Sequence, residues 1–258
     1  MSASAPLPIE LPSAGTSDAP AASRHEQPQG PQLSVVIPAY NECGNLEPLL
    51  DEIEHALHTR LRYEVIVVDD GSTDGSAAEL ALLATERQWL KCERHGRNRG
   101  QSAAIHRGVK AARAPIVAVL DGDGQNDPAD IPKLFATLAL SGCRMAIGER
   151  RRRQDTWLRR ASSRIANTVR AALLGDGVSD TGCGLKLFYR RDFLELPAFD
   201  HMHRFLPALV QMNGGTVRCV PVNHRQRRSG TSKYGVRNRL AAGIVDLAGV
   251  LWLKRRRW

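Results

Sequence analysis

The stretch that most constrains this chain is Val119-Leu120-Asp121-Gly122-Asp123-Gly124-Gln125-Asn126-Asp127-Pro128. Residues 116–120 are apolar and mostly β-branched, so they predict a buried strand, and the turn-forming residues after them predict a loop at its carboxyl end. In an open α/β sheet, ligands bind at that edge. Two carboxylates at i and i+2 of a loop suit Mg²⁺ or Mn²⁺, which bridge carboxylates to substrate phosphates. Taken alone, the pattern fits an ordinary Asp-Gly turn equally well.

The rest of the chain predicts an α/β fold with a mainly parallel sheet flanked by helices. Apolar runs predict strands at 33–38, 65–68, near 90, at 116–120, 145–147, 185–189 and 217–222. Helical spacing of apolar residues predicts helices at 45–57, through 83, at 100–112, around 135–140 and at 205–212. Strands that are apolar on both faces and alternate with helices are typical of a parallel sheet covered on both sides.

The composition favours a globular protein with an anionic partner. A chain of 258 residues with 42% hydrophobic content can bury the core of one domain. Its 36 Lys and Arg against 27 Asp and Glu leave a net charge of +9, which favours a nucleic acid, an anionic membrane or a phosphorylated substrate. The five cysteines are odd in number and contain no C-x-x-C pair, so we expect reduced thiols in a cytosolic protein rather than disulfides or a zinc site.

The two ends of the chain differ from its centre. Residues 1–31 are rich in Ala, Pro, Ser, Gly and Gln, which predicts a disordered tail, and the N-terminus lacks the pattern of a signal peptide. Residues 237–258 predict a C-terminal helix whose apolar part, 240–253, is interrupted only by Asp246 and followed by Lys254-Arg255-Arg256-Arg257. This part is shorter than the roughly 20 residues that cross a bilayer. It fits either an interfacial helix anchored by Trp252 and Trp258 or a packing helix with a basic end.

Several motifs in fixed order carry a resemblance to a known family. They are Pro38-Ala39-Tyr40-Asn41-Glu42, Val68-Asp69-Asp70-Gly71-Ser72-Thr73-Asp74, Asp121-Gly122-Asp123-Gly124-Gln125, Asp180-Thr181-Gly182-Cys183-Gly184-Leu185-Lys186-Leu187-Phe188 and His224-x-x-Arg227-x-x-Gly230-x-Ser232-Lys233-Tyr234. Together they resemble the family 2 glycosyltransferases of GT-A fold, and among these the dolichyl-phosphate and undecaprenyl-phosphate sugar transferases, including dolichol-phosphate mannosyltransferase. The resemblance covers about residues 33–253, so it implies a catalytic domain at 32–236.

The resemblance assigns roles to matching positions. It implies a metal and diphosphate site at Asp121, Asp123 and Gln125, with Mg²⁺ or Mn²⁺ as cofactor. It implies a nucleotide-sugar pocket that also includes Pro38, Tyr40, Glu42, Asp70 and Ser232. It implies an acceptor-phosphate site at Arg159, Ser163 and Arg204, and a flap that closes on the donor diphosphate with Arg227, Ser232 and Lys233. Asp123, Arg227 and Lys233 are the expected catalytic residues.

The implied reaction is the inverting transfer of one sugar, mannose before others, from a nucleotide diphosphate sugar to polyprenyl phosphate. A divalent cation with Arg227 and Lys233 would neutralise the leaving diphosphate. A lipid phosphate with a second pKa of about 6 is already a charged nucleophile, so no general base is needed. No catalytic histidine is therefore expected. His55, His58 and His106 fall on predicted helices, where we expect surface or packing roles. Lys254–Trp258 lacks the Q-x-x-R-W signature of processive synthases, which favours a single transfer.

The resemblance also implies a cytoplasmic enzyme, peripheral at the inner face of the membrane, with a separate membrane protein as partner and a role in the cell envelope. One alternative is a family 2 transferase for another lipid or saccharide acceptor. A second is a basic nucleic-acid-binding protein, suggested by the charge and by the arginines of 150–170 but disfavoured by 5% aromatic content and acidic loops. A dinucleotide-binding enzyme is disfavoured because no G-x-G-x-x-G follows the first strand.

Overall fold

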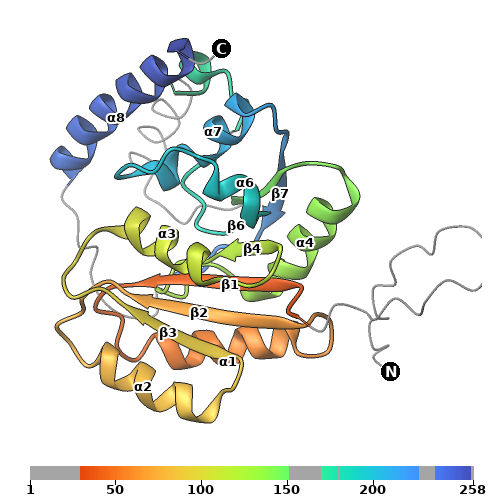
Figure 1. The fold of residues 1–258 in the computed structure, drawn as a ribbon, viewed down its shortest axis with the longest axis vertical. Helices are drawn as coiled ribbons and strands as arrows, with labels where there is room; N and C mark the ends of the chain where they lie inside the picture. The colour runs from red at the N-terminus through yellow and green to blue at the C-terminus, as the bar shows by residue number, and fades with distance from the viewer. Residues whose placement is uncertain (1–29, 151–169, 179, 227–235, 257–258) are drawn as a thin grey trace, which may run out of the picture.

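The computed structural model describes residues 30–150, 170–178, 180–226 and 236–256. Its centre is a seven-stranded sheet with the strand order β3-β2-β1-β4-β6-β5-β7 (Figure 1). The expected mixed fold with a mainly parallel, helix-flanked sheet is confirmed. The predicted tail at 1–31 falls almost entirely outside the described residues.

The N-terminal half is a parallel sheet with helical connections. β1 lies between β2 and β4 and runs parallel to both, pairing Leu33 with Tyr63 and with Ile116. The elements of this half are β1 (Leu33–Ala39), α1 (Leu46–Leu57), β2 (Tyr63–Asp69), α2 (Ser76–Glu86), β3 (Leu90–Arg94), α3 (Gln101–Ala111) and β4 (Ile116–Val119). Because β1, β2 and β4 point the same way, the loops that follow them meet at one edge of the sheet.

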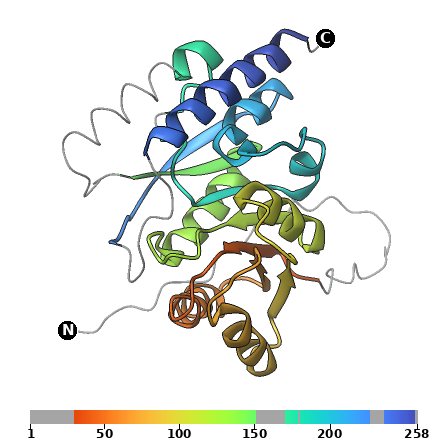
Figure 2. The ribbon, with the colours of Figure 1, turned by 90° about the vertical axis from the view of Figure 1, so that its left-hand side faces the viewer.

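The C-terminal half adds a strand of opposite direction. β6 pairs antiparallel with both β4 and β5, whereas β5 and β7 are parallel. The elements are η1 (Pro128–Asp130), α4 (Ile131–Leu140), β5 (Met145–Arg150), β6 (Lys186–Tyr189), α6 (Arg190–Leu194), η2 (Met202–Arg204), α7 (Leu206–Met212), β7 (Val217–Val222) and α8 (Val236–Arg256). Figures 1 and 2 show α2 and α8 at opposite ends of the molecule.

Alternating side chains of the central strands build two cores. Val35 and Ile37 of β1 are fully buried in a cluster that includes residues of α1, α2 and α4, whereas Val36 is buried with residues of α3, α6 and α7 on the other face. Since successive side chains of a strand point to opposite faces, a strand covered on both sides reads as a continuous apolar run. α3 packs closely on β1, because a Cβ added to Gly108 would lie 2.4 Å from Cγ1 of Val36.

Candidate active site

The loops that follow β1 and β2 are joined by hydrogen bonds. Asn41 N donates to Ser72 Oγ at 2.9 Å, and Thr73 N donates back to Asn41 Oδ1 at 2.8 Å. Glu42 N donates to Ser76 Oγ at 2.9 Å, so the first loop is also held to the start of α2. The predicted nucleotide residues Pro38, Tyr40 and Glu42 therefore lie on a braced surface at the carboxyl edge of the sheet.

Asp70 organises the segment that leads into α3. Its Oδ1 lies 2.6 Å from His95 Nδ1 and accepts a hydrogen bond from Arg99 N at 2.9 Å, and its Oδ2 accepts from Gly100 N at 2.8 Å. Asp70 and His95 are both buried, at 3% and 4% exposure. The predicted contact of Asp70 with a nucleotide base stays a prediction, since its carboxylate already orders residues 95–100.

Asp121 and Asp123 lie in the loop after β4, as predicted. Asp121 Oδ1 accepts a hydrogen bond from Gln101 Nε2 at 2.8 Å, and Asp123 Oδ1 accepts from Gln125 N at 3.1 Å. Gln101 is the first residue of α3, directly after Gly100. The nucleotide loops and the carboxylate pair are therefore linked through two adjacent residues of the chain.

The electrostatics of the pair suit a divalent cation. Burial raises the pKa of Asp121, the nearby Asp123 carboxylate raises it further, and Lys186, Arg150 and Gln101 oppose the shift. The neighbouring groups thus balance the negative charge of the two carboxylates only in part, and a bound cation would balance the rest. Within the described residues, no three His, Cys, Asp or Glu side chains gather closely enough to hold an ion by themselves. Asp121, Asp123 and Gln125 fit a Mg²⁺ or Mn²⁺ that takes its other ligands from substrate phosphates.

Gly184 lies directly against Asp121 and Asn126. A Cβ at Gly184 would lie 2.1 Å from Asp121 Oδ2 and 2.5 Å from Asn126 Oδ1, so both oxygens face the same small space. Asn126 Oδ1 is buried without a hydrogen-bond partner among the described residues. Only glycine leaves room here for the two oxygens.

Two basic residues lie behind the carboxylates. Arg150 forms a bidentate ion pair with Asp180, with Nε to Oδ2 at 2.6 Å and Nη2 to Oδ1 at 2.7 Å. Lys186 is 5% exposed, and its Nζ donates to the carbonyl of Cys183. Burial lowers the pKa of Lys186, while Cys183, Asp121 and Asp180 oppose the shift. The motif around Gly182-Cys183-Gly184 thus holds the Lys186 amine near Asp121.

Arg225 fastens the start of the predicted flap to the carboxylate loop. Its Nη2 lies 2.6 Å from Asp127 Oδ1, and its Nη1 lies 2.7 Å from Glu52 Oε2 on α1. Its backbone N donates to the carbonyl of Gln125 at 2.9 Å. Burial would raise the pKa of Asp127, but hydrogen bonds from Arg225 and Ala129 outweigh it and lower the pKa. The flap residues Arg227, Ser232 and Lys233 lie outside the described residues.

One predicted acceptor residue, Arg204, is described and ends the short helix η2. His203, beside it, is partly buried and contacts α3: Ser102 Oγ lies 2.8 Å from His203 Nδ1. Burial lowers the pKa of His203 well below its usual value, with Lys186 and Arg204 acting in the same direction. Arg204 is thereby held near the helix that begins at Gln101. The other two predicted residues, Arg159 and Ser163, lie outside the described residues.

The structure adds residues that the sequence analysis did not single out. Gln101, Arg225, Lys186 and Gly184 all support the predicted carboxylates. Gly184 and Lys186 lay within a quoted motif, and Arg225 lay in the predicted flap. No local signal distinguished Gln101, whose partner lies 20 positions away.

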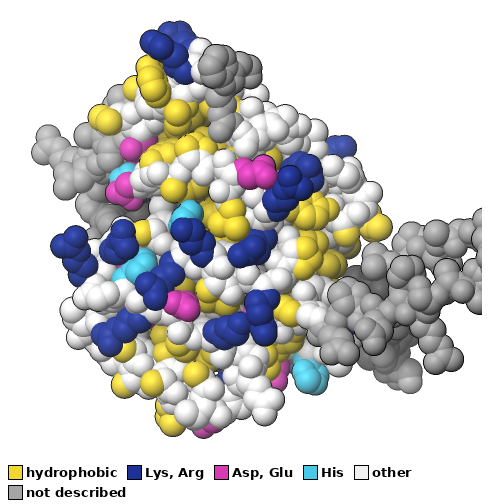
Figure 3. Space-filling model, viewed as in Figure 1, with side chains coloured by type: hydrophobic (Ala, Val, Ile, Leu, Met, Phe, Trp, Pro, Cys, Tyr) yellow, Lys and Arg dark blue, Asp and Glu magenta, His cyan; other side chains and the backbone are white. Residues whose placement is uncertain are grey.

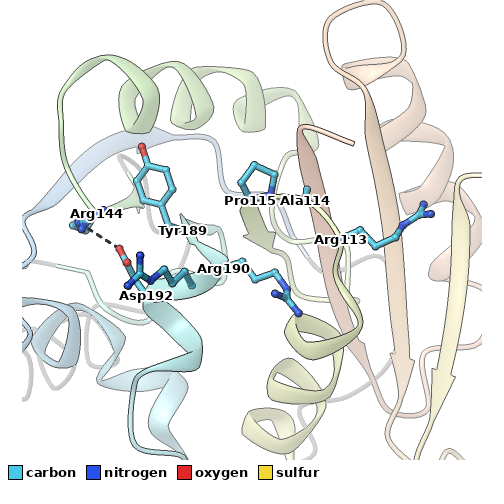
Figure 4. A pocket seen from close by; sticks show the side chains of 8 residues that line it. Arg113, Ala114, Pro115, Arg144, Tyr189, Arg190 and Asp192 are labelled. Carbon is cyan, nitrogen blue, oxygen red and sulfur yellow. Dashed lines mark ion pairs between the residues drawn. The ribbon is translucent and has the colours of Figure 1, made fainter. Parts of the chain in front are cut away.

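A surface hollow of about 320 Å³ lies elsewhere. Figure 4 shows it lined by Arg113, Arg144, Tyr189, Arg190 and Asp192, among others. Pro115, which precedes β4, also lines it, whereas Asp121 follows the other end of that strand. The arginines have structural partners: Arg113 pairs with Glu64 at 2.9 Å, and Arg190 donates to the carbonyls that end α3. This hollow is therefore separate from the carboxylate site.

No helix in the described part of the chain combines the length and the apolar character that a membrane span requires.

Comparison with known proteins was made for sequence and for structure. The family model for glycosyl transferase family 2 matches residues 34–196. The dodecaprenyl-phosphate galacturonate synthase of Rhizobium johnstonii is 34% identical over 232 residues, covering 88% of this chain and 68% of that protein. The undecaprenyl-phosphate 4-deoxy-4-formamido-L-arabinose transferases of Aeromonas hydrophila and Proteus mirabilis are 36% and 37% identical, each match covering 79% of this chain and 63% of the relative. The chain thus spans less than two thirds of those two relatives.

Solved structures share the fold. Glucosyl-3-phosphoglycerate synthase from Mycobacterium tuberculosis, in complex with Mn²⁺, UDP and glucosyl-3-phosphoglycerate, superposes with a TM-score of 0.67 and 21% identity, over 87% of this chain and 80% of that chain. The same enzyme with Mg²⁺ and UDP gives a TM-score of 0.67 and 21% identity, over 87% and 79%. The predicted GT-A fold is confirmed.

Proposed function

This chain belongs to glycosyl transferase family 2, and on that basis we propose that it transfers one sugar from a nucleotide diphosphate sugar to a polyprenyl phosphate. The observation that carries the proposal is the carboxylate pair of the partly buried Asp121 and the buried Asp123, linked through Gln101 to the segment that Asp70 orders. A site for diphosphate and cation beside a braced nucleotide surface is what such a transfer requires.

The acceptor follows from the named relatives. The similar proteins of R. johnstonii, A. hydrophila and P. mirabilis are named for dodecaprenyl phosphate or undecaprenyl phosphate. Their agreement across different sugars supports a polyprenyl phosphate acceptor rather than another lipid or a saccharide. Arg204, held by η2 near α3, remains the described candidate for contact with that phosphate.

The names of the relatives do not support the expected mannose donor. The relatives are named for galacturonate and for 4-deoxy-4-formamido-L-arabinose, and neither name supports mannose. We therefore place nucleotide-linked galacturonate and the modified arabinose ahead of a mannose donor.

The mechanism follows from the charges of the site. A Mg²⁺ or Mn²⁺ held by Asp121, Asp123 and Gln125 would neutralise the leaving diphosphate, and the Mn²⁺ and Mg²⁺ complexes of the structural neighbour support this choice of ion. Gln101 and Gly184 fix the direction of the Asp121 carboxylate, and Arg225 fixes the loop that carries Asp123 and Gln125. Arg227 and Lys233 are proposed to contact the diphosphate from the flap.

The transfer is one displacement at the anomeric carbon. An oxygen of the acceptor phosphate forms the new bond to that carbon as the bond to the diphosphate oxygen breaks, so the configuration inverts. The phosphate is already anionic near neutral pH, with a second pKa of about 6, so no side chain has to remove a proton. His203 is consistent with this, because its ring is hydrogen-bonded to Ser102 and fills a structural position.

A lipid acceptor places the reaction at a membrane surface. We propose that the enzyme works as a peripheral protein at the inner face of the membrane. A separate membrane protein as partner remains a prediction from the sequence.

The test measures donor binding and transfer separately. Thermal shift with UDP- and GDP-sugars in Mn²⁺ or Mg²⁺ identifies the donor, because a bound ligand stabilises the folded state. Transfer is then measured with radiolabelled donor and polyprenyl phosphate. We expect Asp123→Ala to abolish transfer with little change in melting temperature, and Asp192→Asn, in the arginine-lined hollow, to retain it. Full transfer in the presence of a chelator, or a product that stays in water, would refute the proposal.

A further inference from the structure

Helix α8 presents apolar side chains on two opposite faces. On the inner face, Val250 is 1% exposed, and Leu247 and Leu251 pack against the core. On the outer face, Val245 is 71% exposed and Trp252 is 58% exposed, two helical turns apart. Ala248 and Gly249 lie between them and are also exposed. We call Val245, Ala248, Gly249 and Trp252 the outer stripe.

Two polar contacts fix which face of α8 points outward. Asp246 Oδ2 lies 2.9 Å from His201 Nδ1, beside η2. Lys254 Nζ donates to the carbonyl of Leu174 at 2.5 Å. These contacts are two turns apart on the side that packs on the domain, so the helix cannot turn the outer stripe inward without breaking both. These two contacts therefore keep the outer stripe on the surface of the protein.

Positive charge lies next to the outer stripe. Lys254, Arg255 and Arg256 follow it, and the guanidinium of Arg256 lies 5.7 Å from the centre of the Trp252 ring. Figure 3 shows basic side chains at the C-terminal end of α8 and hydrophobic side chains along its outer edge. Tryptophan beside Lys and Arg on one helix suits the boundary between lipid headgroups and acyl chains, where the ring is half buried and the cations meet anionic headgroups.

We propose that the outer stripe of α8, with Arg255 and Arg256, docks on an anionic lipid bilayer. The helix then lies along the headgroup region, with Val245 and Trp252 entering it. The biological role of this docking rests on the proposed function, in which the acceptor is a membrane lipid. The geometry and charge of the docking surface are properties of α8 alone. It names the surface by which the active site is brought to its acceptor.

Charge also argues against a second copy of the chain as the occupant. α8 ends in three basic residues, Lys254, Arg255 and Arg256, beside the outer stripe. Two copies of α8 packed in parallel through the outer stripe would bring these basic ends together. An anionic bilayer complements them.

Vesicle flotation tests the proposal without any substrate. The full chain is mixed with vesicles of phosphatidylcholine alone or with phosphatidylglycerol added. We expect strong flotation only with the anionic vesicles, weakened at least about tenfold in Val245→Glu and in Trp252→Glu. Removal of Arg255 or Arg256 should weaken it about fivefold each, from roughly 1 kcal/mol per basic residue near an anionic surface. Leu82→Glu is the matched control, because Leu82 is 64% exposed on α2, at the opposite end of the molecule.

Each outcome decides the proposal. Loss of flotation in the α8 variants, with melting temperature and flotation of Leu82→Glu unchanged, supports it. Equal flotation of wild type and Val245→Glu, or equal loss in Leu82→Glu, overturns it. A concentration-dependent dimer in sedimentation velocity that Val245→Glu abolishes, without vesicle binding, would assign the outer stripe to a second copy and also overturn it. Vesicle binding without sugar transfer would refute the proposed function and leave this inference standing.

Discussion

Substitution of Gly184 by alanine tests the geometry of the carboxylate pair most directly. The new Cβ would lie 2.1 Å from Asp121 Oδ2, and ordinary contact begins near 3.4 Å, so the carboxylate has to move by more than 1 Å. A misplacement of about 1 Å at a reacting group costs on the order of 10²-fold in rate, equivalent to about 2.7 kcal/mol. We therefore expect kcat/KM for sugar transfer to fall about 10²-fold in Gly184→Ala.

The controls separate this effect from a general loss of stability. In Gly122→Ala the new Cβ would lie 3.3 Å from the carbonyl of Pro38, so a shift of a few tenths of an ångström suffices and we expect a loss of a few-fold. In Gly96→Ala nothing lies within 4 Å, and we expect near wild-type activity. Transfer rates and melting temperatures are measured for all three variants. If Gly184→Ala kept activity equal to that of Gly96→Ala, Gly184 would not constrain Asp121 and the reasoning would be wrong.

Three further predictions concern ion pairs. Arg225→Met should lower the free energy of unfolding in urea by about 1 kcal/mol or less, because the Arg225 side chain is 36% exposed and solvent screens its ion pairs. The loss in transfer rate, expressed as a free energy, should be larger. Equal losses in stability and in transfer would contradict a positioning role for Arg225. At Glu64, burial would raise the pKa, but hydrogen bonds from Arg113, Ser34 and Lys91 lower it below the usual 4.5, so its stabilising contribution is present above that pH and is lost as pH falls through the lowered pKa. The drop in urea midpoint between neutral pH and acid should therefore be smaller in Glu64→Gln than in wild type, and an unchanged drop would exclude this source. Asp246→Asn weakens the pair with His201, so we expect a melting temperature lower by about 2–4 °C for a loss of about 1 kcal/mol, with Asp200→Asn as the exposed control; equal shifts in the two variants would count against the pair.

Elements of the fold are predictable from the sequence where one local pattern decides the outcome. β1, β2 and β4 were predicted because each is an uninterrupted apolar run of strand length, a pattern that neither the amphipathic helices nor the polar loops show. Once their common direction was expected, Asp70 and Asp121 had to follow strand ends at the same edge of the sheet. The predicted order of the strands is confirmed for the described residues, whereas α6 and the short helices η1 and η2 were not predicted.

Features set by distant parts of the chain were not predicted. The antiparallel direction of β6 depends on the path of the chain between β5 and β6, and no residue of Lys186–Tyr189 encodes direction. Arg225 looked like one of several flap residues, although its partner Glu52 lies 173 positions earlier. Gly184 was visible as part of a glycine-rich turn, but only the packing shows that Asp121 faces it.

Residues 99–102, at the start of α3, connect several parts of the site to one helix. Arg99 and Gly100 donate to Asp70, Gln101 donates to Asp121, and Ser102 contacts His203. Four consecutive residues, 99–102, thus hold Asp70, Asp121 and His203, which lie at the proposed nucleotide, metal and acceptor sides of the site. A thermal displacement of α3 along its axis would move all three in the same direction and leave the spacing between donor and acceptor nearly unchanged.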